Sequence, residues 1–318
     1  MRSLVWFSAA LAIAYCTEQA DVRGAGMISP YVRRQRLASE LRKLRIGAGL
    51  THEQLAKRIG QSRAQISRLE NGHVADQDDV MRILDALGVD DERWTQIMTF
   101  AREAGERGWW ESNKNMGERQ ALYANLEAGA QTIREFAMTF VPGLLQTEEF
   151  TRFRTEAEGS QGDIDWVAAK VIEARAGRQR MLRRPGGPTY DVILDELAVR
   201  RIAAPEEVVK AQLYHITATV NGNTRMRLRV LPVDARVEGY VVPRSAFSIY
   251  TFSDPGDPTI VAVDTVTKDL LVAEEEPSKQ YVRIFEALWD ASYSQADSLE
   301  LLLAGTQAIE PPRKVRRP

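Results

Sequence analysis

The chain has 318 residues, of which 44% are hydrophobic and 27% are charged, and its formal net charge is −2. This length favours two domains, and the composition is typical of a globular protein that buries a core. The single cysteine, Cys16, excludes an internal disulfide framework and a cysteine-based zinc cluster, and the histidines have no metal-ligand spacing. The composition therefore predicts neither a metal site nor a cofactor. A net charge close to zero leaves the question of a nucleic-acid partner to the distribution of the charges.

Residues 1–29 form a signal-like or mis-started extension that we predict to lie outside the fold. The apolar run from Leu4 to Tyr15 resembles a secretory signal but is short for a membrane span. Bulky Tyr15 before Cys16 argues against a lipoprotein, and Met27 is an alternative start. Because no further cysteine follows, we expect a cytoplasmic protein with no membrane partner.

Residues 50–72, "LTHEQLAKRIGQSRAQISRLENG", predict two short helices joined at one glycine. Thr51 and Gln54 have the spacing of a capping box, which begins the first helix. Gly60 ends that helix as a residue that accepts a positive φ, and Ser62 is placed to cap the second helix.

The spacing of three residues within this stretch favours a helix-turn-helix over an ordinary core hairpin. In a helix-turn-helix two helices cross steeply over a short turn, so their backbones come close. Ala56 is small enough for that approach, Gly60 supplies the turn, and Ile66 fills the junction, with Leu69 buried beside it. A helical hairpin within a larger core remains the alternative.

The charges are unevenly distributed along the chain. Between Pro30 and Gly72 there are ten Lys/Arg residues and three acidic residues, 10 − 3 = +7, and an acidic stretch follows directly. A basic block of this kind is typical of a surface that contacts phosphates.

The stretch resembles the XRE (Cro/phage-repressor-like) helix-turn-helix family, whose pattern is LT-x-x-x-LA-x-x-x-G-x-S-x-x-x-IS-x-x-E-x-G. The resemblance implies an all-α bundle of about five helices over residues 30–103, with Ser62–Glu70 as the recognition helix in the major groove of double-stranded DNA. It also implies an ion pair between Arg45 and Glu70 that orients this helix without touching DNA.

Carried onto this sequence, the resemblance predicts which side chains touch DNA. Arg63, Ala64 and Arg68 are expected at base edges, because arginine matches the acceptors of guanine and alanine can touch a thymine methyl. Contacts to the phosphate backbone, which fix the register without reading sequence, are expected from the remaining polar side chains: His52, Gln61, Ser62, Gln65 and Ser67.

Beyond this unit we predict a linker at 104–116, where Trp109 and Trp110 are expected to dock on a domain, and an α+β domain at 117–306. Residues 117–136 have helical spacing and are expected to form one helix. Residues 190–195 and 224–232 predict strands, and 246–252 with 259–266 predict a hairpin, so we expect a small antiparallel sheet. The tail, 307–318, is basic and proline-rich, and is predicted to be disordered.

The C-terminal half also resembles a domain of unknown function that follows an XRE helix-turn-helix in many actinobacterial regulators. The motifs are "LEAGAQTIREF…VPGLLQTEEF", "VILDELAVRR" and "FSDPGDPTIVAVDT". Such proteins are similar to antitoxin-like regulators, often encoded beside a small companion protein. The resemblance implies that this half serves dimerisation, ligand sensing or partner docking.

Candidate catalytic groups are few. Asp195 and Glu196 follow a predicted strand, but such a pair equally caps a helix, and His215 has no nearby nucleophile in the sequence. We therefore expect a DNA-binding regulator, binding as a homodimer, rather than an enzyme. Two alternatives stay open: a protein whose main role is to hold the companion, and a toxin or enzyme activity in the C-terminal domain.

Overall fold

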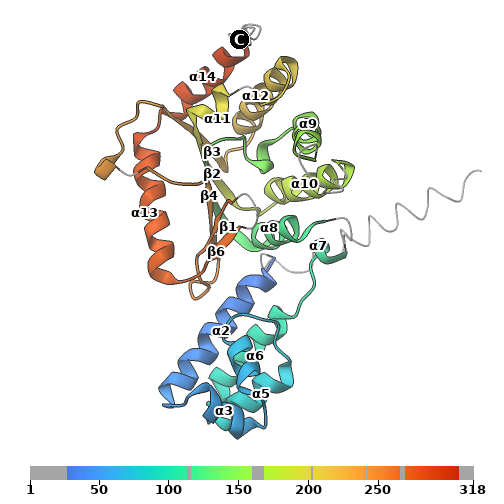
Figure 1. The fold of residues 1–318 in the computed structure, drawn as a ribbon, viewed down its shortest axis with the longest axis vertical. Helices are drawn as coiled ribbons and strands as arrows, with labels where there is room; N and C mark the ends of the chain where they lie inside the picture. Colours follow the sequence, from blue (N-terminus) through green and yellow to red (C-terminus); the bar gives the residue numbers. More distant parts are fainter. Residues whose placement is uncertain are drawn as a thin grey trace, which may run out of the picture.

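The computed structural model describes residues 27–112, 116–159, 168–201, 203–240, 242–265 and 269–307. The chain forms a helical N-terminal lobe and a larger C-terminal lobe with a central sheet (Figure 1). The predicted fold class, an all-α unit followed by an α+β domain, is confirmed. Among the described residues no helix is both long and apolar enough to cross a membrane. The predictions for residues 1–26 and for the tail beyond Gln307 lie outside the described residues.

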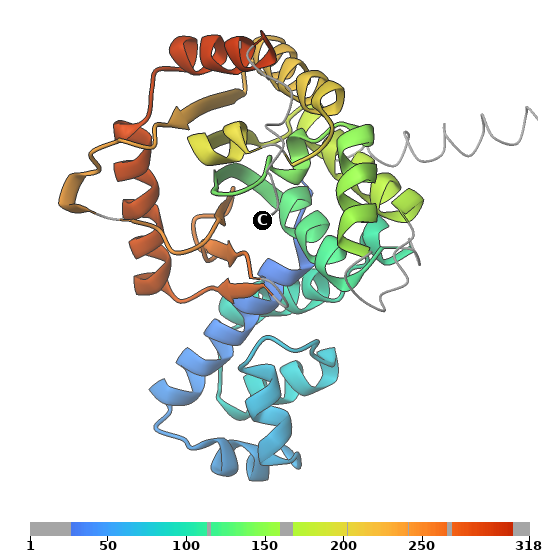
Figure 2. The same cartoon turned by 45° about the horizontal axis from the view of Figure 1, so that its top comes forward.

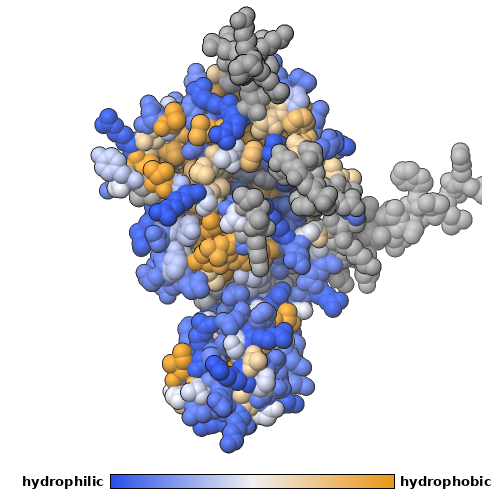
Figure 3. Space-filling view, viewed as in Figure 1, coloured by the Kyte–Doolittle hydropathy of each residue, from blue (hydrophilic) through white to orange (hydrophobic). Residues whose placement is uncertain are grey.

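The N-terminal lobe consists of five helices around one apolar core. The core contains Leu41, Leu55, Ile66, Ile83 and Ile97, each at most 1% exposed. On the face shown in Figure 3 the surface of this lobe is largely hydrophilic. The helices are α2 (Pro30–Gly47), α3 (His52–Ile59), α4 (Arg63–Leu69), α5 (Gln77–Ala86) and α6 (Asp91–Ala104).

The C-terminal lobe contains a six-stranded mixed sheet in the order β3-β2-β1-β4-β5-β6. Its first three strands are parallel, and the other pairs are antiparallel. The expectation of a small antiparallel sheet was therefore wrong, because helical crossovers separate the first three strands and such connections give parallel pairs. The strands are β1 (Ala130–Ala137), β2 (Thr189–Asp195), β3 (Met226–Leu231), β4 (Phe247–Phe252), β5 (Ile260–Val263) and β6 (Leu270–Val272).

The expected single helix over 117–136 is instead a helix that ends at Gly129 followed directly by β1. Strand β1 pairs with β2 on one edge and with β4 on the other, and its two faces contribute to two different cores. Ile133 packs in the core on one face and Phe136 in the core on the other. Because a strand buried on both faces lacks polar alternation, the spacing of these two residues imitates a helix.

Helices cover both faces of the sheet (Figures 1 and 2). One core includes residues of α8, α12 and α14, and the other includes Phe285 and Leu288 of α13. The helices are α7 (Trp109–Ser112), α8 (Glu118–Gly129), α9 (Glu148–Gly159), α10 (Ala168–Arg183), α11 (Glu196–Arg200), α12 (Glu206–Asn221), α13 (Glu275–Ala291) and α14 (Gln295–Gln307), with short 3-10 turns η1 (Gly143–Leu145) and η2 (Glu238–Tyr240).

Two segments expected outside the domains take part in the fold. In the predicted linker, Trp110 is 4% exposed and packs with Ala124 and Ala128 of α8. At the end of the predicted extension, Ser29 is 2% exposed, and its hydroxyl donates to Asn125 Oδ1 at 2.6 Å. Ser29 belongs to the fold because it also caps α2 by accepting a hydrogen bond from the Val32 amide.

Candidate nucleic-acid interface

Helix α3 begins with the expected capping box. The Gln54 amide donates to Thr51 Oγ1 at 3.2 Å, and the Thr51 amide donates to Gln54 Oε1 at 2.8 Å. The helix ends at Gly60, whose φ of 69° lies in the left-handed region. There the Gln61 amide bonds back to the Ala56 carbonyl at 2.9 Å. Glycine is favoured here by its backbone conformation rather than by lack of space.

Helices α3 and α4 meet through the residues that the spacing indicated. Ala56 is 3% exposed, Ile66 1% and Leu69 2%, and all three belong to one core. Ser62 caps α4 by accepting a hydrogen bond from the Gln65 amide at 3.1 Å. The geometry of a helix-turn-helix is therefore present, with α4 in the position of the recognition helix.

A buried carboxylate at the end of α4 fixes its orientation. Glu70, 3% exposed, accepts from Arg45 Nε at 2.6 Å and Nη2 at 2.8 Å. His52 Nε2 lies 3.0 Å from the same carboxylate, and Arg42 Nη2 donates to the Glu70 carbonyl at 2.6 Å. Although burial opposes ionisation, the hydrogen bonds from Arg45 and His52 hold the pKa of Glu70 below its ordinary value. The expected Arg45–Glu70 pair is present, as the centre of a larger cluster.

The outer side of α4 presents cationic side chains. Arg63, Ala64 and Arg68 are exposed. Within the described part of the chain, neither arginine lies within ion-pair distance of a carboxylate, and the same holds for Lys57 and Arg58 on α3. Guanidinium groups without internal partners are free to bind guanine edges or phosphates.

The side chains expected to contact phosphates divide into two groups. Ser62 is exposed, and Ser67 is half-buried beside Asn71. Gln61 and Gln65 instead donate to the two oxygens of Asp79, at 2.6 and 3.2 Å. These bonds tie the start of α4 to α5. The role of Asp79 has no signal in the sequence, because no spacing rule connects a first-turn acid of one helix to the side-chain amides of another segment.

His52 also has an internal partner, and its expected contact with a phosphate stays a prediction. Its Nε2 faces the Glu70 carboxylate, so the ring supports the cluster from within. The basic block also presents fewer free cations than its count suggested. Arg33, Arg36 and Arg45 pair with internal carboxylates.

Arg33 connects the two lobes. Its Nε lies 2.8 Å from Glu103 of α6, within the N-terminal lobe. Its Nη1 lies 2.9 Å from Asp254 and 2.7 Å from Asp257, on the turn between β4 and β5. The guanidinium also lies over the ring of Phe100, 5.2 Å from its centroid. One largely buried cation therefore holds α2, α6 and the β4–β5 turn together.

The pKa values of Asp254 and Asp257 beside Arg33 shift in opposite directions. The hydrogen bond from Arg33 lowers the pKa of Asp254. Burial raises the pKa of Asp257 from its ordinary 3.8 to about 6, against the attraction of Arg33. The Asp257 side chain is 6% exposed, and an excess of negative charge around one arginine leaves this carboxylate incompletely compensated.

The candidate catalytic groups have structural partners. Asp195 caps α11 by accepting from the Leu197 amide at 2.9 Å. Glu196 accepts from the Val233 amide at 2.8 Å and pairs with Arg200. His215 contacts Thr219 within α12. The interpretation of Asp195 as a helix cap is therefore the one that the geometry shows.

These features define a helix-turn-helix protein with a second, larger α+β domain, and the family comparisons agree. Residues 36–94 match a family described as a helix-turn-helix domain, and residues 120–304 match the domain of unknown function DUF5753. Because the second match covers more than half of the chain, the protein belongs to the DUF5753 family. No curated protein and no solved structure matches the chain.

Proposed function

We propose that the protein is a sequence-specific, DNA-binding transcriptional regulator of the XRE type that acts in the cytoplasm. One observation carries the proposal. Helix α4 exposes Arg63 and Arg68 without internal partners, while the buried Glu70 cluster fixes the helix that bears them. Rigid, unpaired guanidinium groups on a helix of this kind are suited to direct readout in the major groove.

The proposal includes a homodimer. Helix-turn-helix proteins commonly bind two half-sites about 34–36 Å apart, one on each copy. A single short α4 reads too few base pairs to select a site in a genome, and a second copy multiplies the affinity. Sedimentation of the protein with and without DNA measures the stoichiometry, and two chains per site are expected.

The first experiment identifies the DNA. Sequencing genomic fragments retained by the full-length protein supplies a candidate site, which is then titrated against the protein. Arg63→Ala is expected to cost about 1–3 kcal/mol and to relax preference at one base position. Lys57→Ala, an exposed cation on α3, is the matched control, and it should weaken binding to all sequences about equally. An equal loss on every sequence with Arg63→Ala would contradict the base-reading role.

Salt dependence provides a second test. Binding should weaken steeply between about 50 and 200 mM salt, because phosphate contacts release counterions. Binding that is unchanged over this range would contradict a phosphate-based mode.

A second candidate function is the antitoxin-like role, in which the protein holds a small companion. The observation that favours it is the segment between β3 and β4, which protrudes beside α13 (Figure 1). It exposes Val233 at 72%, Tyr240 at 93% and Val242 at 82%. Co-purification with tagged full-length protein tests this role. Tyr240→Ser should lose a specific small protein and keep DNA binding.

We assign no catalytic step to the C-terminal domain, and the cap formed by Asp195 supports that choice. Asp195→Asn provides the check. The substitution should leave DNA binding unchanged, whereas loss of a hydrolytic or toxic activity from an otherwise folded protein would favour an enzyme.

A further inference from the structure

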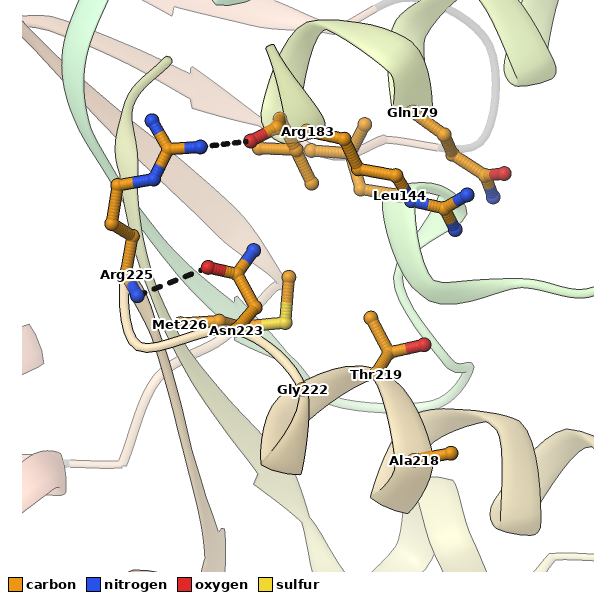
Figure 4. Close-up of a pocket in the computed structure, with 10 residues that line it drawn as sticks. Leu144, Gln179, Arg183, Ala218, Thr219, Gly222, Asn223, Arg225 and Met226 are labelled. Carbon is orange, nitrogen blue, oxygen red and sulfur yellow. Dashed lines mark hydrogen bonds between the residues drawn. The ribbon is translucent and has the colours of Figure 1, made fainter. Parts of the chain in front are cut away.

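A cavity of about 410 Å³ lies in the C-terminal lobe, where the C-terminal ends of α10 and α12 meet the amino end of β3 (Figure 4). This volume is within the range of small-molecule sites. Its walls belong to η1, α10, the end of α12 with the loop that follows it, and the first residue of β3. They comprise Leu144, Gln179, Leu182, Arg183, Ala218, Thr219, Gly222, Asn223, Arg225 and Met226.

The lining contains two arginines and no carboxylate. The two arginines differ in their bonding. Arg225 donates to three carbonyls, those of Gly187, Leu182 and Arg184, at 2.8 to 3.2 Å, so its guanidinium is occupied. Arg183 is exposed and has no hydrogen bond or ion pair with the described residues. The cavity therefore has one available cation and no nearby acid in its lining to neutralise it.

The same cavity combines an apolar wall with neutral donors. Leu144, Leu182 and Met226 are 4–5% exposed and supply the apolar surface. Thr219 has a hydroxyl on the α12 side. Asn223 Oδ1 accepts a hydrogen bond from the backbone amide of Arg225 at 3.0 Å. The side-chain NH2 group of Asn223 is therefore left as a donor.

We propose that this cavity binds a small organic anion with an apolar body. The negative head pairs with Arg183 and accepts from Thr219 or Asn223. The apolar body lies against Leu144 and Met226. A guanidinium recognises a carboxylate or a phosphate through parallel hydrogen bonds, so either head group fits this chemistry.

The position of the cavity also connects it to the DNA-binding lobe. Helix α10 bears Arg183 and also Arg178, whose guanidinium lies 2.5 Å from Glu127 of α8. On the same helix α8, Asn125 accepts hydrogen bonds from Ser29 and Tyr31 at the start of α2. A ligand that shifts α10 therefore acts on the element that supports α2. This second step, an effector role, rests on the proposed DNA-binding function.

Binding is tested on the full-length protein with phenylbutyrate, phenyl phosphate and the uncharged phenylbutyramide. An anion should bind at least about tenfold more tightly than the amide, because a charge-assisted pair is lost with the amide. Arg183→Gln should abolish this preference. The matched control is Arg180→Gln, an exposed arginine on the same helix outside the lining, and it should keep it. Which anion binds more tightly distinguishes the two head groups.

The reaction rate of an introduced thiol tests the positive charge of the cavity independently of binding affinity. Thr219→Cys in a Cys16→Ser background gives one thiol in the cavity. An anionic methanethiosulfonate reagent should react with this thiol faster than a cationic one does. Arg183→Gln should reverse this difference in rate. Phenylbutyrate or phenyl phosphate should protect the thiol. Equal binding of acid and amide, or equal effects of Arg183→Gln and Arg180→Gln, overturns the proposal.

The effector role has a separate readout. An anion that binds the cavity should change DNA affinity, and DNA should change the affinity for the anion by the same factor. Anion binding with unchanged DNA affinity rejects the effector role but keeps the site. Anion binding by a protein that binds no DNA rejects the proposed function instead.

Discussion

Removing the Glu70 side chain should destabilise α4 more than removing an exposed acidic side chain does. In Glu70→Ala the guanidinium of Arg45, 11% exposed in its side chain, loses both of its bonds to the carboxylate and keeps only the bond to the Leu50 carbonyl. A stranded charge of this kind costs about 3–5 kcal/mol, whereas an exposed ion pair contributes about 0–1 kcal/mol. The structure therefore predicts a cost of about 3–5 kcal/mol for Glu70→Ala.

Hydrogen exchange of the intact protein, followed on peptides from α3 and α4, measures this cost locally. A global unfolding curve would combine two lobes and so would not report on one helix. A loss of about 3 kcal/mol accelerates exchange by about two orders of magnitude. Glu53→Ala, which removes an exposed acid in the first turn of α3, is the control and should cost less than about 1 kcal/mol.

Arg45→Met and the double variant Arg45→Met/Glu70→Ala complete a double-mutant cycle with Glu70→Ala. Because each single change strands the other charge, the double variant should cost less than the two single costs added together. The pKa of Glu70 is lowered on folding, so its contribution is present above its ordinary pKa of 4.5 and is lost as the pH falls through the folded value. If Glu70→Ala accelerates exchange no more than Glu53→Ala, the reasoning is refuted.

Three further predictions concern other parts of the fold. Gly60→Ala should destabilise the N-terminal lobe by about 1–2 kcal/mol, because alanine is strained at this positive φ, and hydrogen exchange of peptides from α3 and α4 measures the loss. Asp257 has a raised pKa of about 6, so stability should fall as the pH rises from about 4 to 6, and a denaturation series over pH should flatten in Asp257→Asn. Glu127→Gln strands Arg178, which is 7% exposed, and should cost about 3–5 kcal/mol, seen as faster exchange in α8 and α10.

Much of the N-terminal lobe could be predicted because its determinants are local. The capping box at Thr51, the turn at Gly60 and the buried contacts of Ala56 and Ile66 all depend on residues within one short stretch. Local patterns also predicted β3, whose Met226 and Leu228 are buried.

The errors arose where distant residues decide the outcome. Strand β1 is a strand because β2 and β4 pair with it, and neither strand is close in the sequence. The sequence likewise does not show that Glu70 lies beside His52. Contacts across long sequence separations leave no periodic signal.

Helix α2 contributes residues to the cores of both lobes, and this determines how a movement of one lobe reaches the other. Its first turn places Val32 in the core of the C-terminal lobe, whereas Leu37 and Leu41, further along, lie in the core of the N-terminal lobe. An α-helix of this length is stiff, so the two cores are attached to one rigid element. Arg33 adds a bond to the β4–β5 turn near the same point. The two lobes are therefore connected through α2 as well as along the chain after α6. A displacement of α8 should rotate α4, and in the proposed homodimer such rotations would change the distance between the two half-sites.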